Sequence, residues 1–80
     1  MAVLRVFSRP GCHLCEQLVV VLLPLVRGRL AVEVVNIDED DQLRQEYGRR
    51  IPVLEYAGRF VCQYTLDNGA LQGILDSLPE

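Results

Sequence analysis

The sequence predicts an α/β domain in which helices cover both faces of a four-stranded mixed sheet. Segments rich in β-branched residues alternate with segments of helical periodicity, in the order strand, helix, strand, helix, strand, strand, helix. A strand–helix–strand connection requires parallel pairing, whereas two strands joined by a tight turn are antiparallel. Eighty residues without an internal repeat or linker make a single domain over 1–80.

Four strands are expected. Residues 2–7 (AVLRVF) and 30–37 (LAVEVVNI) are rich in valine and isoleucine, which suit the pleated surface of a sheet. The segment 51–64 has the pattern of two strands around a tight turn at 57–59, which predicts an antiparallel hairpin.

The first helix is expected over 12–26, where apolar residues recur at helical spacing. These residues are Leu14, Leu18, Val21, Leu22 and Leu25. Pro24 lacks an N–H and clashes with the carbonyl four residues back, so it predicts a kink or an early end in the last turn. Gly28 is expected to end the helix.

The two later helices are expected to begin at acidic residues. The acidic run 38–41 suits the positive end of a helix dipole, and Gly48 ends that helix. Asp67 is the expected N-cap of the last helix, with Leu66 contacting Leu71 across the first turn.

Charge and hydropathy exclude several classes of function. The net charge of −3 and the isoelectric point near 5.0 argue against binding of nucleic acid, which requires a basic face. The longest apolar run, 18–26, is too short to cross a membrane and contains a proline. The first residues lack the pattern of a signal peptide, so a cytoplasmic location is expected.

Cys12 and Cys15 form a C-x-x-C pair directly after the first strand, at the start of the first helix. A close pair in the reducing cytoplasm is typical of a catalytic or metal-binding site rather than of a permanent disulfide. Free N–H groups at a helix N-terminus stabilise a thiolate at Cys12. Cys15 lies one turn later on the same side, within reach of a sulfur bonded to Cys12.

A proline at the start of the third strand is the second distinctive feature. Pro52 cannot donate to a neighbouring strand, and a cis bond after Ile51 accounts for its position. Two arginines precede this dipeptide. One of them is expected to bind a carboxylate, and Arg50 is placed to pair with Glu46, four residues before it.

These features together resemble the glutaredoxin branch of the thioredoxin superfamily over nearly the whole chain: CHLC at 12–15 after a strand, and Ile-Pro before the hairpin. The resemblance implies a thioredoxin-like βαβαββα three-layer sandwich. It also implies that Cys12 attacks a disulfide and Cys15 resolves the mixed disulfide. Ile51, before a cis Pro52, would offer its backbone to a bound peptide or to glutathione.

The function implied is that of a dithiol thiol–disulfide oxidoreductase without a bound cofactor. Its substrate would be a disulfide-containing protein or glutathione. Electrons would come from glutathione or from a thioredoxin-reductase-type flavoenzyme. The chain departs from glutaredoxins in having His13-Leu14 where Pro-Tyr is usual, and no Gly-Gly pair precedes Asp67. Glutathione as the specific partner therefore does not follow.

Four other residues near these motifs have two interpretations each. His13 and Arg9 are candidate substrate-binding residues, since either could stabilise a thiolate or attract an anion, but both could be ordinary surface residues. Cys62 alternates with aromatic residues on the last strand, which favours a small buried hydrophobe over a third redox thiol. Tyr64 is expected to be a packing residue rather than a substrate contact.

Two alternatives come from other classes of function. Cys12, Cys15, Cys62 and His13 could nominally hold a metal, although no second C-x-x-C is present, and an iron–sulfur cluster shared between two copies is a further option. The other alternative is a non-catalytic thioredoxin-like module that binds an extended peptide. Such a module needs neither cysteine, so the pair disfavours it.

Overall fold

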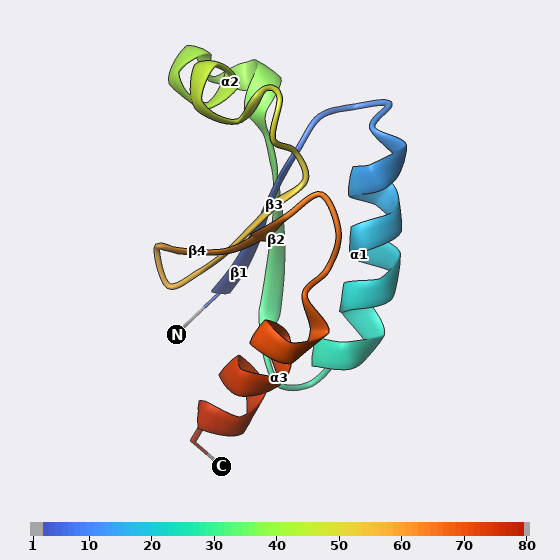
Figure 1. Cartoon of the computed structure of the whole chain (residues 1–80), viewed down its shortest axis with the longest axis vertical. Helices are drawn as coiled ribbons and strands as arrows, with labels where there is room; N and C mark the ends of the chain where they lie inside the picture. Colours follow the sequence, from blue (N-terminus) through green and yellow to red (C-terminus); the bar gives the residue numbers. More distant parts are fainter. Residues whose placement is uncertain (1–2, 80) are drawn as a thin grey trace.

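The structure is a computed structural model that describes residues 3–79, and Figure 1 shows how their helices and strands are arranged. A short 3-10 turn, Ile37–Glu39, follows the second strand. The strands are β1 Val3–Ser8, β2 Ala31–Asn36, β3 Val53–Tyr56 and β4 Arg59–Gln63. The helices are α1 His13–Val26, α2 Asp41–Tyr47 and α3 Asn68–Ser77.

The strands form one mixed sheet in the order β2-β1-β3-β4. β1 pairs with β2 in parallel, as the crossover through α1 requires, and with β3 antiparallel. β3 and β4 form the expected antiparallel hairpin. The predicted order of elements and the mixed sheet are therefore confirmed.

Helices cover both faces of the sheet, unequally. α1 and α3 lie on one face and bury most of the core (Figure 1). That cluster consists of Leu4, Val6, Leu18, Leu22, Val26, Leu54, Cys62, Leu71 and Leu75. The short α2 packs on the other face, where Leu43 and Tyr47 adjoin a smaller cluster of Phe7, Ile37 and Val53.

α1 contacts the sheet through a stripe that differs from the set of residues that the periodicity indicated. The buried residues are Cys15, Leu18, Leu22 and Val26, whose spacing of three or four places them on one side of the helix. Leu14, Val21 and Leu25 are exposed instead. The expected early end at Pro24 is wrong, because the helix continues to Val26.

The acidic side chains cap the later helices as expected. The Asp40 carboxylate accepts hydrogen bonds from the N–H groups of Gln42 and Leu43, 2.9 and 3.3 Å long. Asp67 accepts from the N–H of Ala70 at 3.0 Å. Both caps satisfy N–H groups that have no partner within their own helix.

The hairpin has a two-residue turn and an irregular pairing. Ala57 and Gly58 have φ of 51° and 80°, and positive φ at both positions matches the twist of the strands that they join. The register shifts between Leu54 and Glu55. In a regular strand, Phe60 and Cys62 would lie on the same face of the sheet. Because of the shift they differ: Phe60 is exposed and Cys62 is buried.

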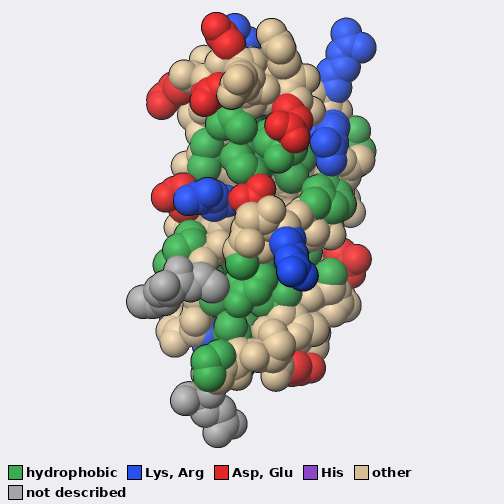
Figure 2. Space-filling model, turned by 90° about the vertical axis from the view of Figure 1, so that its left-hand side faces the viewer, with side chains coloured by type: hydrophobic (Ala, Val, Ile, Leu, Met, Phe, Trp, Pro, Cys, Tyr) green, Lys and Arg blue, Asp and Glu red, His purple; other side chains and the backbone are tan. Residues whose placement is uncertain are grey.

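The sheet face opposite α1 is only partly covered. Figure 2 shows hydrophobic side chains on this side of the molecule, interrupted by a band of charged ones. Arg5 and Glu33, paired in register across β1 and β2, form an ion pair of 3.1 Å. Within residues 3–79 no helix is long and apolar enough to cross a membrane.

The buried stripe predicts how two leucines of α1 differ. Leu22→Ala should reduce the free energy of unfolding by about 3 kcal/mol, because it leaves a cavity under a fully buried side chain. Leu25→Ala, the same change at an exposed position of the same helix, should cost less than about 1 kcal/mol. Urea unfolding of the two variants and the parent measures both values. Equal losses would contradict the orientation of α1.

Candidate redox site

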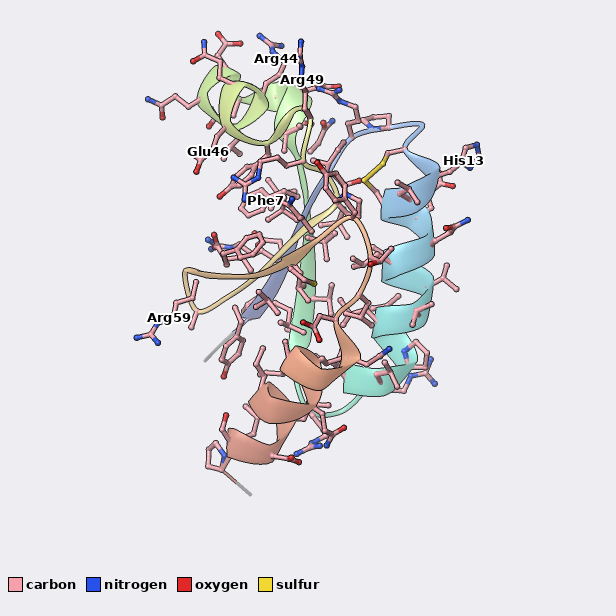
Figure 3. All side chains as sticks on the ribbon, in the orientation of Figure 1. Phe7, His13, Arg44, Glu46, Arg49 and Arg59 are labelled. Carbon is pink, nitrogen blue, oxygen red and sulfur yellow. A yellow bond between two sulfur atoms is a disulfide. The ribbon has the colours of Figure 1, made fainter. Side chains whose placement is uncertain are left out.

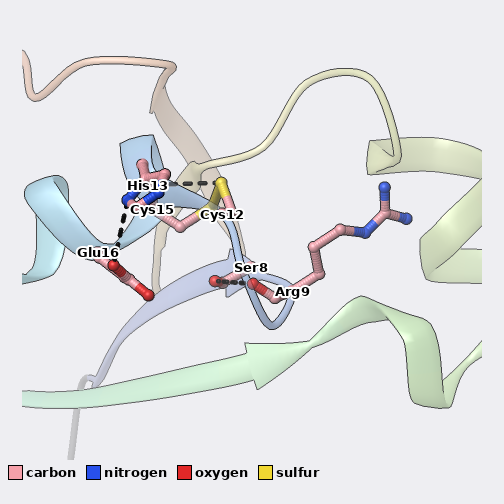
Figure 4. Close-up of a disulfide and its surroundings, with 6 residues drawn as sticks. All are labelled: Ser8, Arg9, Cys12, His13, Cys15 and Glu16. Carbon is pink, nitrogen blue, oxygen red and sulfur yellow. Dashed lines mark hydrogen bonds and ion pairs between the residues drawn. A yellow bond between two sulfur atoms is a disulfide. The ribbon is translucent and has the colours of Figure 1, made fainter.

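Cys12 and Cys15 are joined in a disulfide at the start of α1, with their Cα atoms 5.3 Å apart (Figure 4). Cys12 is the N-cap of the helix, and its Sγ accepts a hydrogen bond of 3.2 Å from the N–H of Cys15. Sulfur here takes the place of the oxygen that usually caps a helix. Cys15 is only 1 % exposed, whereas Cys12 is partly exposed, so the two sulfurs differ in access to solvent.

The turn before α1 carries Cys12 from the end of β1 to the start of the helix. The N–H of Cys12 donates to the carbonyl of Arg9 at 3.3 Å, which closes the turn. Gly11 has φ of 81°, a conformation that side chains rarely adopt. The cysteine pair therefore lies at the carboxyl end of β1, the second strand of the sheet.

The bond between Ile51 and Pro52 is cis, as predicted. The register of β1 with β3 pairs Phe7 with Val53, so Pro52 lies at the end of the sheet from which the chain leads to Cys12. The N–H of Ile51 donates to the carbonyl of Tyr47 at 3.2 Å. Among the described residues no hydrogen bond is made to the Ile51 carbonyl, so this oxygen can accept one from a ligand.

Arg50 is held in a setting that the sequence did not predict. Its guanidinium lies over the rings of Tyr47 and Phe60, 5.5 and 5.4 Å from their centroids. Its Nε donates to the side-chain oxygen of Gln63 at 2.9 Å. Arg50 thus contacts α2 and β4 instead of forming the expected pair with Glu46. These contacts fix the residue that precedes Ile51.

Tyr64 is a second residue of this region whose setting the sequence did not predict. The sequence favours a packing residue here, and Tyr64 is 43 % exposed, with φ of 69°. Its hydroxyl donates to the carbonyl of Arg49 at 2.9 Å, and its N–H donates to the carbonyl of Pro52 at 2.8 Å. Tyr64 therefore ties the loop after β4 to both sides of the Ile51–Pro52 bond. No feature of the sequence around Tyr64 indicates this conformation.

A small groove of about 110 Å³ lies on the side of α1 where Leu14 projects. It lies between the first turns of α1 and the segment that connects β4 to α3. Leu14, inside the C-x-x-C motif, borders the groove on the helix side. The complete lining is Leu14, Gln17, Leu18, Tyr64, Thr65 and Leu66. Its side chains carry no formal charge, so the groove suits an apolar or neutral group.

The two candidate substrate-binding side chains next to Cys12 point away from the disulfide. The His13 side chain is 91 % exposed and lies 3.7 Å from Glu16, and Figure 3 shows it projecting outward from α1. Arg9 extends in the other direction in Figure 4 and donates to Asp38 at 2.9 Å. Both are near Cys12 in the chain, and their part in substrate binding stays a prediction.

Cys62 lies apart from the pair, buried in the core beneath α1 and α3. Burial raises the pKa of its thiol, and the nearby Asp67 carboxylate adds to this, while a backbone hydrogen bond from Asp67 opposes it. The four nominal metal ligands are therefore not brought together. Within residues 3–79 no group of three or more metal-ligating side chains is placed to hold an ion.

Comparison with known families decides the relationship. Residues 3–76 match the family described as Glutaredoxin-like domain (DUF836). The chain belongs to this family. A comparison with curated proteins found no match.

Solved structures show the same fold. Protein Ne2328 from Nitrosomonas europaea is 34 % identical, with a TM-score of 0.81 over 91 % of this chain and 89 % of that one. Protein XcR50 from X. campestris is 36 % identical, with a TM-score of 0.71 over 95 % and 99 %. A mutant thioredoxin from Halobacterium salinarum is 29 % identical, with a TM-score of 0.66 over 99 % and 75 %. The glutaredoxin-like chain thus has the thioredoxin-like fold that the sequence predicted.

The burial of the three thiols predicts their order of alkylation. In the reduced protein, iodoacetamide at pH 7 should modify Cys12 at least about tenfold faster than Cys15 or Cys62, because only Cys12 is partly exposed. Cys62 should stay unmodified until the pH exceeds the ordinary range of a thiol, since its pKa is raised. Peptide mapping by mass spectrometry gives the three rates. Fast modification of Cys62 at pH 7 would contradict its burial.

Proposed function

We propose that this glutaredoxin-like protein is a dithiol thiol–disulfide oxidoreductase in which Cys12 is the nucleophile and Cys15 the resolving thiol. The unequal access of the two sulfurs is the observation that carries the proposal. A substrate can approach Cys12, whereas the buried Cys15 can reach only a sulfur already attached to Cys12. Membership of the family and the Cys12–Cys15 pair support a redox role.

The reaction transfers two electrons from the protein to a substrate disulfide. The Cys12 thiolate attacks one substrate sulfur, forming a mixed disulfide and releasing the other sulfur as a thiolate that takes up a proton. Cys15 then loses its proton and attacks the Cys12 sulfur. This step forms the Cys12–Cys15 disulfide, which is the state of the structure, and releases the second substrate thiol.

The N–H of Cys15 assists both steps by its position. It donates to the Cys12 sulfur in the disulfide form, and the same donor is available to a Cys12 thiolate in the reduced form. A thiolate stabilised in this way is also a better leaving group when Cys15 attacks the mixed disulfide.

We place the substrate backbone beside Ile51, whose carbonyl is free to accept a hydrogen bond. Two-sided pairing with the Ile51 backbone would require its N–H to leave the Tyr47 carbonyl. The groove beside Leu14 would take an apolar group that flanks the substrate cysteine.

The oxidised pair must be reduced again for turnover. We propose glutathione, two molecules of which would be oxidised to one disulfide, or a thioredoxin-reductase-type flavoenzyme as the donor. The cytoplasm, where thiols are kept reduced, is the compartment in which this reaction would operate.

Single cysteine substitutions test the roles of the two thiols. Reduced protein mixed with a peptide disulfide should transfer its electrons to the peptide in a single turnover. Mass spectrometry measures this transfer. Cys12→Ser should abolish transfer, because no exposed nucleophile remains. Cys15→Ser should accumulate a mixed disulfide at Cys12, because nothing displaces the bound peptide.

Cys62→Ala is the matched control and should transfer electrons like the parent, since Cys62 lies in the core apart from the pair. Full transfer by Cys12→Ser would overturn the proposal. A protein that binds the peptide but never reacts with it would favour the peptide-binding module instead.

Arg50 is a positioning residue for Ile51, and its substitution has a distinct signature. Arg50→Met keeps an unbranched side chain but loses the hydrogen bond to Gln63 and the charge over the two rings. The KM for a peptide disulfide should rise by about three- to tenfold with kcat nearly unchanged, because the loosened backbone binds substrate less well. Arg59→Met at the exposed hairpin turn is the control, and equal effects would contradict this role (Figure 3).

A further inference from the structure

The outer side of α1 carries an apolar surface that nothing in the described chain covers. No charged residue occurs between Glu16 and Arg27, and several large side chains in this run are exposed. Val20 is 70 % exposed and Leu23 is 46 % exposed. Contiguous exposed apolar residues on a small protein usually mark a contact with another molecule.

Four residues on this surface form a line along the helix, which we call the outer stripe: Glu16, Val20, Leu23 and Arg27. Their spacing of four, three and four residues places them on one side of the helix, as in the seam of a coiled coil. The outer stripe lies on the side of α1 from which His13 projects (Figure 3). It does not include the buried residues Cys15, Leu18, Leu22 and Val26.

The outer stripe has the same chemistry from either end except for the sign of charge. From Glu16 to Arg27 its side chains are acidic, apolar, apolar and basic. Two copies of α1 packed antiparallel about a twofold axis would therefore place Val20 of each copy opposite Leu23 of the other. Glu16 of each copy would face Arg27 of the other. Glu16 and Arg27 lie about 16 Å apart along each helix, so one such pair would form at each end of the contact.

The charges at the two ends are available for such a contact. The Glu16 side chain is 66 % exposed, and among residues 3–79 its ion-pair partner is His13, at 3.7 Å. Arg27 is exposed and forms no ion pair with any residue from 3 to 79. An intermolecular Glu16–Arg27 pair would use both side chains without breaking an ion pair between a carboxylate and an arginine.

The edge of the sheet extends the surface on one flank. Leu14 borders the β4–α3 segment, so the other flank of α1, with Leu23, faces the β2 edge. Val34 of β2 is paired with the buried Val6 and thus points to the α1 side, where it is exposed. Val34 therefore adds an exposed apolar side chain on the α1 side of this edge.

We propose that the protein forms an antiparallel homodimer through the outer stripe of α1. The contact is at the small end of specific interfaces, so its dissociation constant should be on the order of 0.1 mM. Cys12 lies four residues before Glu16, just beyond the acidic end of the outer stripe. The proposal is independent of the activity proposed above.

Sedimentation equilibrium of the oxidised protein, from about 20 µM to about 1 mM, tests the dimer. Leu23→Glu should abolish self-association, because it puts a carboxylate into the apolar centre of the contact. Leu25→Glu is the matched control: Leu25 is 45 % exposed on the same helix but on the other flank, so association should be unchanged. If Leu23→Glu fails to fold by circular dichroism, Val20→Glu replaces it.

Charge reversal tests the antiparallel arrangement. Glu16→Arg and Arg27→Glu should each weaken association by about tenfold, because two attractive pairs become repulsive. The double variant should restore the parent value. A parent that stays monomeric at the highest concentration, equal loss in Leu25→Glu, or no recovery in the double variant would each overturn the proposal.

Discussion

The redox site depends on a single side chain, Cys15, that belongs both to the hydrophobic core and to the disulfide. The stripe of Cys15, Leu18, Leu22 and Val26 sets the rotation of α1 on the sheet. Turning the helix on the sheet would expose two leucines, and burial of each one stabilises the folded protein by about 1.5–3 kcal/mol. Core packing therefore decides which thiol is hidden and which reaches solvent, and the roles proposed for the two thiols depend on this difference.

The order of the strands brings the other half of the site to the same place. β1 lies between β2 and β3, so its carboxyl end adjoins both the turn to Cys12 and the start of β3 at Pro52. Tyr64, the first residue after β4, then donates its N–H to the carbonyl of Pro52. Three segments far apart in the chain meet at one end of the sheet, where a hydrogen bond to the Tyr47 carbonyl and packing against the smaller hydrophobic cluster hold Ile51.

Local signals were enough to predict the elements and the chemical groups of the site. The C-x-x-C pair, the Ile51–Pro52 dipeptide and the cap at Asp67 each depend on a few adjacent residues. The buried side of α1 could not be predicted, because nearly every position from 18 to 26 is apolar and the pattern admits several orientations. Only contact with the sheet selects one of them.

The settings of Tyr64 and Arg50 were also beyond sequence reasoning. Positive φ is usual for Gly or Asn but not for Tyr, so no turn signal marks Tyr64. Arg50 contacts Phe60 and Gln63 of β4, and Phe60 lies beyond the register shift in the hairpin. Without the register shift, Phe60 would lie on the same face of the sheet as Cys62. Both residues depend on the geometry of β4, which emerges only when the sheet is assembled.

The apolar composition of α1 has a different physical consequence on each side of the buried stripe. On one flank Leu14 borders the groove at the β4–α3 segment, and on the other Leu23 is exposed on the side toward β2, the opposite edge of the sheet. A helix needs only one apolar stripe to pack on a sheet, so stability of the domain does not account for the leucines and valines on the flanks. Because the buried residues separate the flanks, a substitution at Leu23 leaves the groove intact and one at Leu14 leaves the outer stripe intact. The proposed substrate contact and the proposed self-association can therefore be varied independently within one helix.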